Sequence, residues 1–248
     1  MRRSSGEIRF LAVVTYGRTG STTLQAALNA LPGVTIRGEN YGALRGLHDY
    51  VQALAETADR HHAGRPAHPW FGSARLRPDD VLTSLRSHVL ETVLRPPRDS
   101  TWVGFKEVRY EPGHFATYDE LLEFLLFLDK LLPGIRFLIN VRDPESAARS
   151  GWWPEHDDAR GALRESRERL GRAAEDLAEL LGADRVVLID YDEWVARPDV
   201  VTRAFRTLGL PRDDEAVREA LDTRLAHGQH GDGSLAQAAL EEGRRDDR

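Results

Sequence analysis

The segment from Tyr16 to Thr23, YGRTGSTT, combines two glycines, one arginine and a run of hydroxyl side chains. Glycines let the backbone approach a ligand closely, and hydroxyl and free N–H groups donate hydrogen bonds to anionic oxygens. An apolar run precedes the segment and a helical pattern follows it, so a helix N-terminus with its positive dipole would face the same ligand. The segment is therefore predicted to bind a phosphate or sulfate group, the alternative being an ordinary strand-to-helix turn.

The spacing within this loop differs from that of ATP-binding loops. Gly17 and Gly20 are three positions apart and no lysine follows Gly20, whereas the nucleotide-kinase signature has four residues between its glycines and then Lys-Ser/Thr. A second anion contact is predicted at Arg142, which directly follows the apolar run 135–141, with Ser150 eight residues later. A guanidinium fork and a hydroxyl suit a dianionic phosphate.

Two further residues have the chemistry of acid–base or charge-stabilising groups. Glu39 follows the short apolar segment 34–37 and a turn at Gly38. Lys106 lies in the segment 102–110, WVGFKEVRY, and is one of only two lysines among 34 basic residues. A salt bridge with a neighbouring glutamate, Glu107 or Glu111, is the structural alternative for Lys106. Strand alternation would place Arg109 on the same face as Glu107, so we interpret that pair as structural.

Short apolar runs alternate with helical patterns along the chain, which is typical of a parallel sheet covered by helices. We therefore expect an α/β fold of three layers, with a mainly parallel central sheet and helices on both faces. Ligands of such sheets bind beyond the carboxyl ends of the strands, where all the segments described above lie. The predicted strands are 8–15, 34–37, 102–110, 135–141 and 185–190, and the main predicted helices are 22–31, 43–61, 79–94, 117–132 (with Thr117 and Glu120 as a capping box) and 158–181.

Composition limits the class of protein. The 248 residues are 41% hydrophobic and 30% charged, which indicates one folded domain over 1–235, followed by a charged tail at 236–248. The net charge of −6 argues against a nucleic-acid partner, and the absence of cysteine excludes disulfides and thiolate metal sites. No apolar run approaches the roughly 18 residues of a membrane span. We expect a cytoplasmic protein, because the apolar N-terminal stretch is short and leads into the glycine loop rather than a signal-cleavage site.

The loop TYGRTGSTTL resembles the 5′-phosphosulfate loop of sulfotransferases, especially the carbohydrate, tyrosylprotein and bacterial enzymes, which have a P-loop-like fold. Gly17 replaces the proline that is usual in that family. The resemblance implies that the co-substrate is 3′-phosphoadenosine 5′-phosphosulfate (PAPS) and that Arg18 contacts its 5′-phosphate and sulfonate. It also implies that the remaining phosphate oxygens are held by Thr19, Gly20, Ser21, Thr22 and Thr23.

The same resemblance assigns roles to the other candidates. Arg142 and Ser150 would grip the 3′-phosphate, and Tyr191, in LIDYDEWVARPDVVTRAFRTLGL, would lie near the adenine or that phosphate. Glu39 matches the Gly-Glu or Pro-Glu pair that supplies the general base in the carboxylate-using enzymes. Lys106 would stabilise charge on the sulfonate or bridging oxygen. The alternative to Glu39 is a histidine base. None of the available histidines lies in a motif that matches the family; they are His48, His61, His62 and His114.

The implied function is metal-independent, in-line transfer of a sulfonate from PAPS to a hydroxyl of a small-molecule, glycan or lipid acceptor. A phosphate-loop nucleotide or metabolite kinase and a non-catalytic nucleotide-binding module are the alternatives. The segments 43–100 and 152–182, which would shape the acceptor site, match no pattern that identifies the acceptor. Trp152 and Trp153 follow Ser150 and could line that cleft. The Gly/His stretch 226–234 is interpreted as a mobile flap rather than a metal site.

Overall fold

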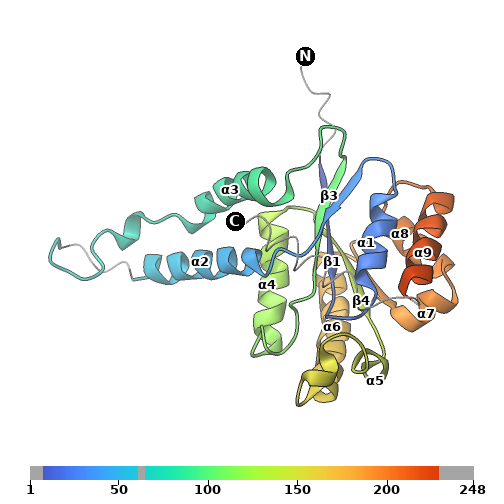
Figure 1. The fold of residues 1–248 in the computed structure, drawn as a ribbon. Coiled ribbons are helices and arrows are strands. Elements are labelled where there is room, and N and C mark those ends of the chain that lie inside the picture. The colour runs from blue at the N-terminus through green and yellow to red at the C-terminus, as the bar shows by residue number, and fades with distance from the viewer. Residues whose placement is uncertain (1–7, 61–64, 229–248) are drawn as a thin grey trace, which may run out of the picture.

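The computed structural model describes residues 8–60 and 65–228, which form a five-stranded sheet with helices around it (Figure 1). The strand order is β2-β3-β1-β4-β5 and every neighbouring pair is parallel. This confirms the predicted three-layer α/β fold. The strands are β1 (Arg9–Val14), β2 (Val34–Arg37), β3 (Trp102–Glu107), β4 (Arg136–Val141) and β5 (Val186–Asp190).

The helices cover both faces of the sheet. Phe10, Ala12 and Val14 of β1 belong to a core shared with α4 (Tyr118–Leu131) and α6 (Ala159–Leu181). Leu11 and Val13 belong to a second core, whose helices lie on the other side of the sheet in Figure 1: α1 (Ser21–Asn29), α7 (Tyr191–Ala196), α8 (Asp199–Thr207) and α9 (Asp214–Gly228). Burial on both faces explains why the strand sequences are continuously apolar.

The segment between β2 and β3 departs from the layered plan. Its helix α2 (Ala43–Ala58) extends away from the sheet in Figure 1, and Leu44 is its only fully buried residue among those described. The chain returns through η1 (Ser73–Arg75) and α3 (Pro78–His88). The remaining short helices are α5 (Pro144–Ala147) and η3 (Trp153–Glu155).

The predicted helix 79–94 changes type near its end. It begins at Pro78 as α3 and continues from Val89 to Leu94 as the π-helix η2. The Arg95 N–H donates to the Leu90 carbonyl at 2.9 Å, a five-residue step that closes the wider turn. Arg95 precedes a proline, which disfavours the right-handed helical region, and its φ is 39°. The helix therefore ends there.

The capping box predicted for α4 is present in a modified form. The Thr117 hydroxyl accepts a hydrogen bond from the Glu120 N–H at 3.2 Å, as expected for an N-cap. The Glu120 carboxylate, however, accepts from the N–H of Ala116 at 2.9 Å. The box thus fixes the chain one residue before the cap.

Strand register brings the candidate residues to one edge of the sheet. Lys106 on β3 pairs with Val13 on β1, and Phe105 pairs with Arg37 on β2. Because all strands run the same way, the segments that follow β1, β2, β3 and β4 emerge at the same edge.

In the described part of the chain, no helix has the length and apolar composition that spanning a membrane requires.

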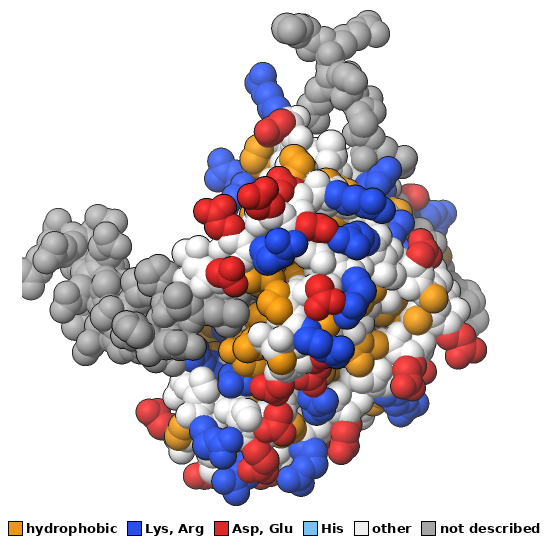
Figure 2. Space-filling model, turned by 90° about the vertical axis from the view of Figure 1, so that its right-hand side faces the viewer, with side chains coloured by type: hydrophobic (Ala, Val, Ile, Leu, Met, Phe, Trp, Pro, Cys, Tyr) orange, Lys and Arg blue, Asp and Glu red, His pale blue; other side chains and the backbone are white. Residues whose placement is uncertain are grey.

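The surface over α1, α8 and α9 carries charges of both signs. Figure 2 shows this face, with basic and acidic side chains interspersed among apolar ones. Two of the ion pairs of α8 are Arg203 with Asp199, at 2.6 Å, and Arg206 with Asp214. Pairs of this exposed kind contribute little to stability.

Candidate active site

The glycine loop between β1 and α1 has the backbone of an anion-binding turn. Arg18 and Gly20 both adopt left-handed conformations, with φ of 70° and 73°. No side chain caps the N-terminus of α1, and the first turn of this described helix contains no acidic residue. A Cβ on Gly20 would lie 2.4 Å from Cε2 of Tyr191, so glycine is required both by the backbone and by the ring.

Two buried side chains fasten this loop to β4. The Tyr16 hydroxyl donates to the Arg142 carbonyl at 2.5 Å and accepts from the Arg142 N–H at 2.8 Å. Burial raises the pKa of Tyr16 to about 12 against the opposing effect of that backbone hydrogen bond, so the hydroxyl stays protonated. Asn140 donates to the Thr19 carbonyl at 2.7 Å and accepts from the Trp194 indole at 3.1 Å. Sequence reasoning missed Asn140, although a polar residue inside the apolar run IRFLINV was the available signal.

The hydroxyl residues of the loop face different surroundings. Thr19 is fully buried and its hydroxyl lies 2.6 Å from the Thr15 hydroxyl, so this side chain points into the protein. Ser21 is buried, Thr22 is exposed and Thr23 is half-buried. Their contacts with phosphate oxygens stay predictions.

Arg18, the pair Arg142 and Ser150, and Tyr191 were predicted from three separate segments, and they lie together. The Arg18 Nε donates to the Ser150 hydroxyl at 3.0 Å, and Arg142 Nη1 donates to the Arg18 carbonyl at 2.8 Å. The Arg142 guanidinium carbon lies 4.3 Å from the centre of the Tyr191 ring. The Arg142 Nε is buried and has no hydrogen-bond partner among the described residues, which leaves a donor for an anion in this cluster.

The two tryptophans have distinct positions beside the loop. Trp153 is buried and its indole N–H donates to the Gly17 carbonyl at 3.3 Å. Trp152 is 51% exposed, and a Cβ on Gly17 would lie 2.4 Å from its Cζ2. The indole of Trp152 therefore occupies the space that a larger residue at position 17 would need.

Glu39 and Lys106 form an ion pair at the carboxyl end of β3. Lys106 Nζ lies 2.5 Å from Glu39 Oε1, and Arg109 Nη1 lies 3.4 Å from Glu39 Oε2. The Lys106 side chain is 6% exposed and the Glu39 side chain 39% exposed. Among the described residues, then, the partner of Lys106 is Glu39 rather than the neighbouring Glu107 or Glu111. The carboxylate remains open to a ligand from one side.

Glu107 organises this end of the sheet. Its Oε2 accepts from the N–H groups of Asn40 and Gly42 at 3.1 and 3.0 Å, and its Oε1 accepts from the Val108 N–H at 2.9 Å. The predicted pair with Arg109 is present at 3.1 Å. Burial would raise the pKa of Glu107, but these hydrogen bonds and the guanidinium outweigh burial and lower the pKa. Asn40 and Gly42 precede Glu107 by 67 and 65 positions, so nothing in the sequence indicated that they are in contact with it.

Glu111 lies against the glycine loop between β1 and α1. Its Oε1 accepts from the Gly17 N–H at 3.4 Å, a long hydrogen bond. Burial raises the pKa of Glu111, and the Gly17 N–H and Arg109 oppose that shift only in part. A carboxylate thus competes for a donor that an anionic ligand would use.

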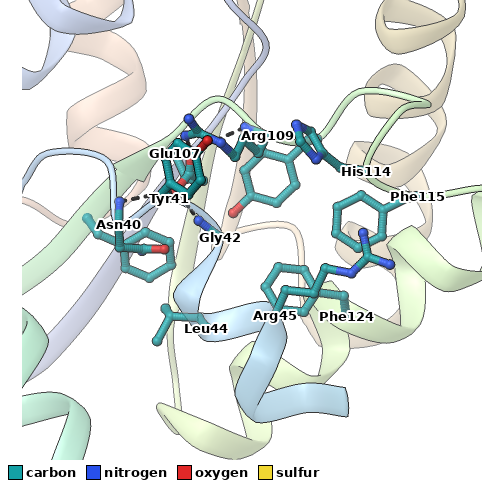
Figure 3. A pocket seen from close by; sticks show the side chains of 12 residues that line it. Asn40, Tyr41, Gly42, Leu44, Arg45, Glu107, Arg109, His114, Phe115 and Phe124 are labelled. Atoms are coloured by element: carbon teal, nitrogen blue, oxygen red, sulfur yellow. Dashed lines mark hydrogen bonds and ion pairs between the residues drawn. The ribbon is translucent and has the colours of Figure 1, made fainter.

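A pocket of about 230 Å³ opens beside Glu107 and Arg109 (Figure 3). It is formed by the Glu39 loop, the start of α2, the segment after β3 and α4. Its lining residues are Asn40, Tyr41, Gly42, Leu44, Arg45, Phe105, Glu107, Arg109, Tyr110, His114, Phe115 and Phe124.

The rival histidines are distributed differently. His114 lines the pocket, and its pKa is lowered by burial and by Arg109 and Arg45. His48 lies on α2 beside Asp49 and the rings of Phe124 and Phe127. His61 and His62 lie outside the described residues, as do 229–234 of the Gly/His stretch and the tail 236–248. Over the described ranges, no three His, Asp or Glu side chains cluster as metal ligands would.

Residues 11–214 match the profile of the Sulfotransferase family. The chain belongs to the sulfotransferase family. The matched residues include the anion loop, Glu39, Lys106, Arg142 and Tyr191, and the match confirms the resemblance seen in the sequence. A search of curated proteins finds no match.

Solved structures of other sulfotransferases are similar to this one. The sulfotransferase domain of the Synechococcus PCC 7002 olefin synthase aligns with a TM-score of 0.52 and 18% identity, over 96% of this chain and 86% of that one. It supports the same fold. A sulfotransferase domain from the curacin biosynthetic pathway aligns with a TM-score of 0.49 and 13% identity, over 86% and 77% of the two chains. Sulfotransferase STF1 from Mycobacterium tuberculosis H37Rv aligns with a TM-score of 0.45 and 17% identity, over 88% and 72%.

Proposed function

We propose that this sulfotransferase uses PAPS and transfers the sulfonate to a hydroxyl group, with Glu39 as the general base. The observation that carries the proposal is the cluster of Arg18, Arg142, Ser150 and Tyr191 beyond the carboxyl ends of β1, β4 and β5. Arg18 and Ser150 are 132 positions apart in the chain, and Tyr191 lies still further along it. A shared anionic ligand would explain why these residues are brought together.

The chemistry of the cluster fits a nucleotide with two phosphate positions. Two guanidinium groups and a hydroxyl suit dianionic phosphate, and the uncapped N-terminus of α1 favours a further anion. The Tyr191 ring offers a flat surface for adenine. The Nε of Arg142, which has no hydrogen-bond partner within residues 8–60 and 65–228, is a candidate donor to the 3′-phosphate. The loop lacks the lysine of ATP-binding loops, so it does not favour a triphosphate.

PAPS, when bound, supplies a sulfonate activated by its bond to phosphate. During transfer the acceptor oxygen forms a bond to sulfur, the bond between sulfur and the phosphate oxygen breaks, and the hydroxyl proton must be removed. Glu39 is the group we assign to accept that proton, because its carboxylate is partly exposed at the edge where the ligands of parallel sheets bind.

Lys106 supplies positive charge beside the base. Its ammonium is almost fully buried, so its interaction with a growing negative charge would be screened less than at the surface. Arg18 adds a second cation from the loop. We infer that these groups provide the charge neutralisation and that the transfer needs no divalent metal.

The decisive experiment compares nucleotides by isothermal titration calorimetry. We expect 3′-phosphoadenosine 5′-phosphate to bind without Mg²⁺, and ATP to bind more weakly with or without it. Tighter ATP binding that depends on Mg²⁺ would contradict the proposal and favour a kinase. Mass spectrometry of a phenolic acceptor incubated with PAPS then tests transfer, and nucleotide binding without transfer would indicate a non-catalytic module.

A further inference from the structure

The pocket beside Glu39 has mainly aromatic and apolar walls. The Tyr110 and Phe115 rings are parallel, with centroids 6.2 Å apart, and Phe124 lies 5.5 Å from Phe115. Leu44 and Phe105 complete the apolar lining. In Figure 3, Phe115 from the segment after β3 and Phe124 from α4 face Leu44 and Tyr41 across the pocket. Such walls favour a flat, apolar body over a hydrated one.

Polar atoms without partners lie within these walls. The amide nitrogen and oxygen of Asn40 and the hydroxyl of Tyr110 are buried and have no hydrogen-bond partner among the described residues. Tyr110 is 1% exposed, and burial raises its pKa, so the hydroxyl is protonated and can both donate and accept. Leaving such groups unsatisfied costs free energy, and their concentration at one pocket indicates a ligand that completes them.

Positive charge borders the same pocket. The Arg45 guanidinium carbon lies 4.6 Å from the centre of the Phe115 ring, and that of Arg109 lies 3.9 Å from the centre of the Tyr41 ring. Arg109 also contacts Glu39 at 3.4 Å, so the wall of the pocket touches the proposed base directly. A ligand seated here would have its outer edge near Glu39.

We propose that this pocket binds the acceptor and selects a small phenolic compound, in which one aromatic ring carries the reacting hydroxyl and a second hydrogen-bonding substituent. The volume of about 230 Å³ agrees with this size, because an apolar cavity of about 150 Å³ holds benzene. Tyr110 and Asn40 bind the second substituent, and the reacting hydroxyl lies on the Glu39 side. This inference rests on the proposed function for the identity of the reaction, but the pocket can be tested without it.

The test measures binding of the three dihydroxybenzenes, and of the matching cyclohexanediols, by ligand-observed NMR. The protein is used with and without 3′-phosphoadenosine 5′-phosphate. We expect the aromatic diols to bind and the cyclohexanediols to bind at least tenfold more weakly. Tyr110→Phe and Asn40→Leu should each weaken binding of the best diol about tenfold, which corresponds to one lost hydrogen bond, and leave the affinity for the nucleotide unchanged.

Thermal stability separates a ligand-binding role from a structural one. Tyr110→Phe removes a hydroxyl that has no hydrogen-bond partner in the described part of the chain, so its Tm should equal or exceed that of the wild type. The matched control is Tyr118→Phe, whose hydroxyl donates to Asp176 at 2.5 Å on α6. That control should lower Tm and leave diol binding unchanged.

Equal diol affinities in the wild type, Tyr110→Phe and Asn40→Leu would overturn the proposal, as would equal binding of aromatic and saturated diols. Failure of the proposed function has a different signature. In that case no sulfated product forms and the nucleotide does not bind, while diol binding to the protein alone still depends on Tyr110 and Asn40 if the pocket is assigned correctly.

Discussion

The ammonium of Lys106 donates a 2.5 Å hydrogen bond to Glu39, a residue 67 positions earlier in the chain. Lys106 lies on β3 and Glu39 lies just after β2. These strands are neighbours in the sheet, since Phe105 on β3 pairs with Arg37 on β2. The sequence suggested each of them on separate grounds, one as a base and one as a charge-stabilising group. Their contact means that a substitution at either position also changes the electrostatic surroundings of the other.

Glu39→Gln should abolish proton acceptance while keeping size and hydrogen bonding. We expect turnover to fall by roughly 10²–10⁴ with nucleotide affinity nearly unchanged. An acceptor with a more acidic hydroxyl, such as a phenol with electron-withdrawing groups, should recover part of the lost rate. Steady-state kinetics across a series of substituted phenols would test this, and full activity in the variant would direct the search for the base to His114 and the other histidines.

Lys106→Ala should slow transfer and weaken PAPS binding, because its charge interacts with both the bound anion and the transition state. Acidic acceptors should not rescue this variant, in contrast to Glu39→Gln. Lys130→Ala, which removes the other lysine of the chain from α4, is the matched control and should behave like the wild type. Rescue of Lys106→Ala by acidic phenols would mean that the lysine acts mainly through Glu39.

Arg142→Ala tests recognition of the 3′-phosphate. Loss of a charge-assisted contact of about 1.5–3 kcal/mol should weaken a 3′-phosphorylated nucleotide at least tenfold and scarcely affect adenosine 5′-phosphosulfate. Calorimetric titrations with both nucleotides would measure the difference, and Arg149→Ala, at an exposed position on the same segment, is the control. Equal weakening of both nucleotides would show that Arg142 does not read that phosphate.

Glu111→Gln should strengthen binding of 3′-phosphoadenosine 5′-phosphate, because it removes a competing carboxylate from the Gly17 N–H. The pKa of Glu111 is raised, so the carboxylate becomes charged only above its ordinary value of 4.5. The nucleotide affinity of the variant divided by that of the wild type should therefore increase as the pH rises through the raised pKa of Glu111, and then stay constant. Titrations between pH 5 and 8 would measure this, with Glu123→Gln on α4 as the control; a constant ratio close to one would exclude the competition.

Glu107→Gln should lower the free energy of unfolding by about 1.5–3 kcal/mol at pH 7, as expected for hydrogen bonds to a charged group. The pKa of Glu107 is lowered in the folded state, so its stabilising effect is present above the ordinary pKa of 4.5 and is lost as pH falls through the lowered value. Urea denaturation at pH 7 and below pH 4 should show the difference between wild type and variant becoming smaller in acid. A difference that does not depend on pH would rule out a role for the ionised carboxylate.

The positions of the strands and helices could be predicted well from the sequence, but not which of them lie side by side in the structure. The buried strands were recognisable from continuous apolar runs, and the anion loop from its glycines and hydroxyls. Such runs contain no information about pairing, so the order β2-β3-β1-β4-β5 and the contact of Glu39 with Lys106 depend on the tertiary structure. The inward direction of the Thr19 hydroxyl depends on the left-handed residues on either side of it. The π-helix η2 likewise had no periodic signal in the sequence.

The way in which Glu107 holds the loop after β2 has a consequence for how acceptor preference could change. Its carboxylate binds the main chain of Asn40 and Gly42, and no side chain of that loop is needed for the attachment. Side chains at position 40 can therefore be exchanged while the peptide path, and with it the placement of Glu39, is retained; at position 41 the replacement must also tolerate the left-handed φ of 57° that Tyr41 adopts. A library randomised at those two positions would alter what enters the pocket without dismantling the machinery next to it, which makes this loop a natural starting point for redesigning the enzyme toward new acceptors.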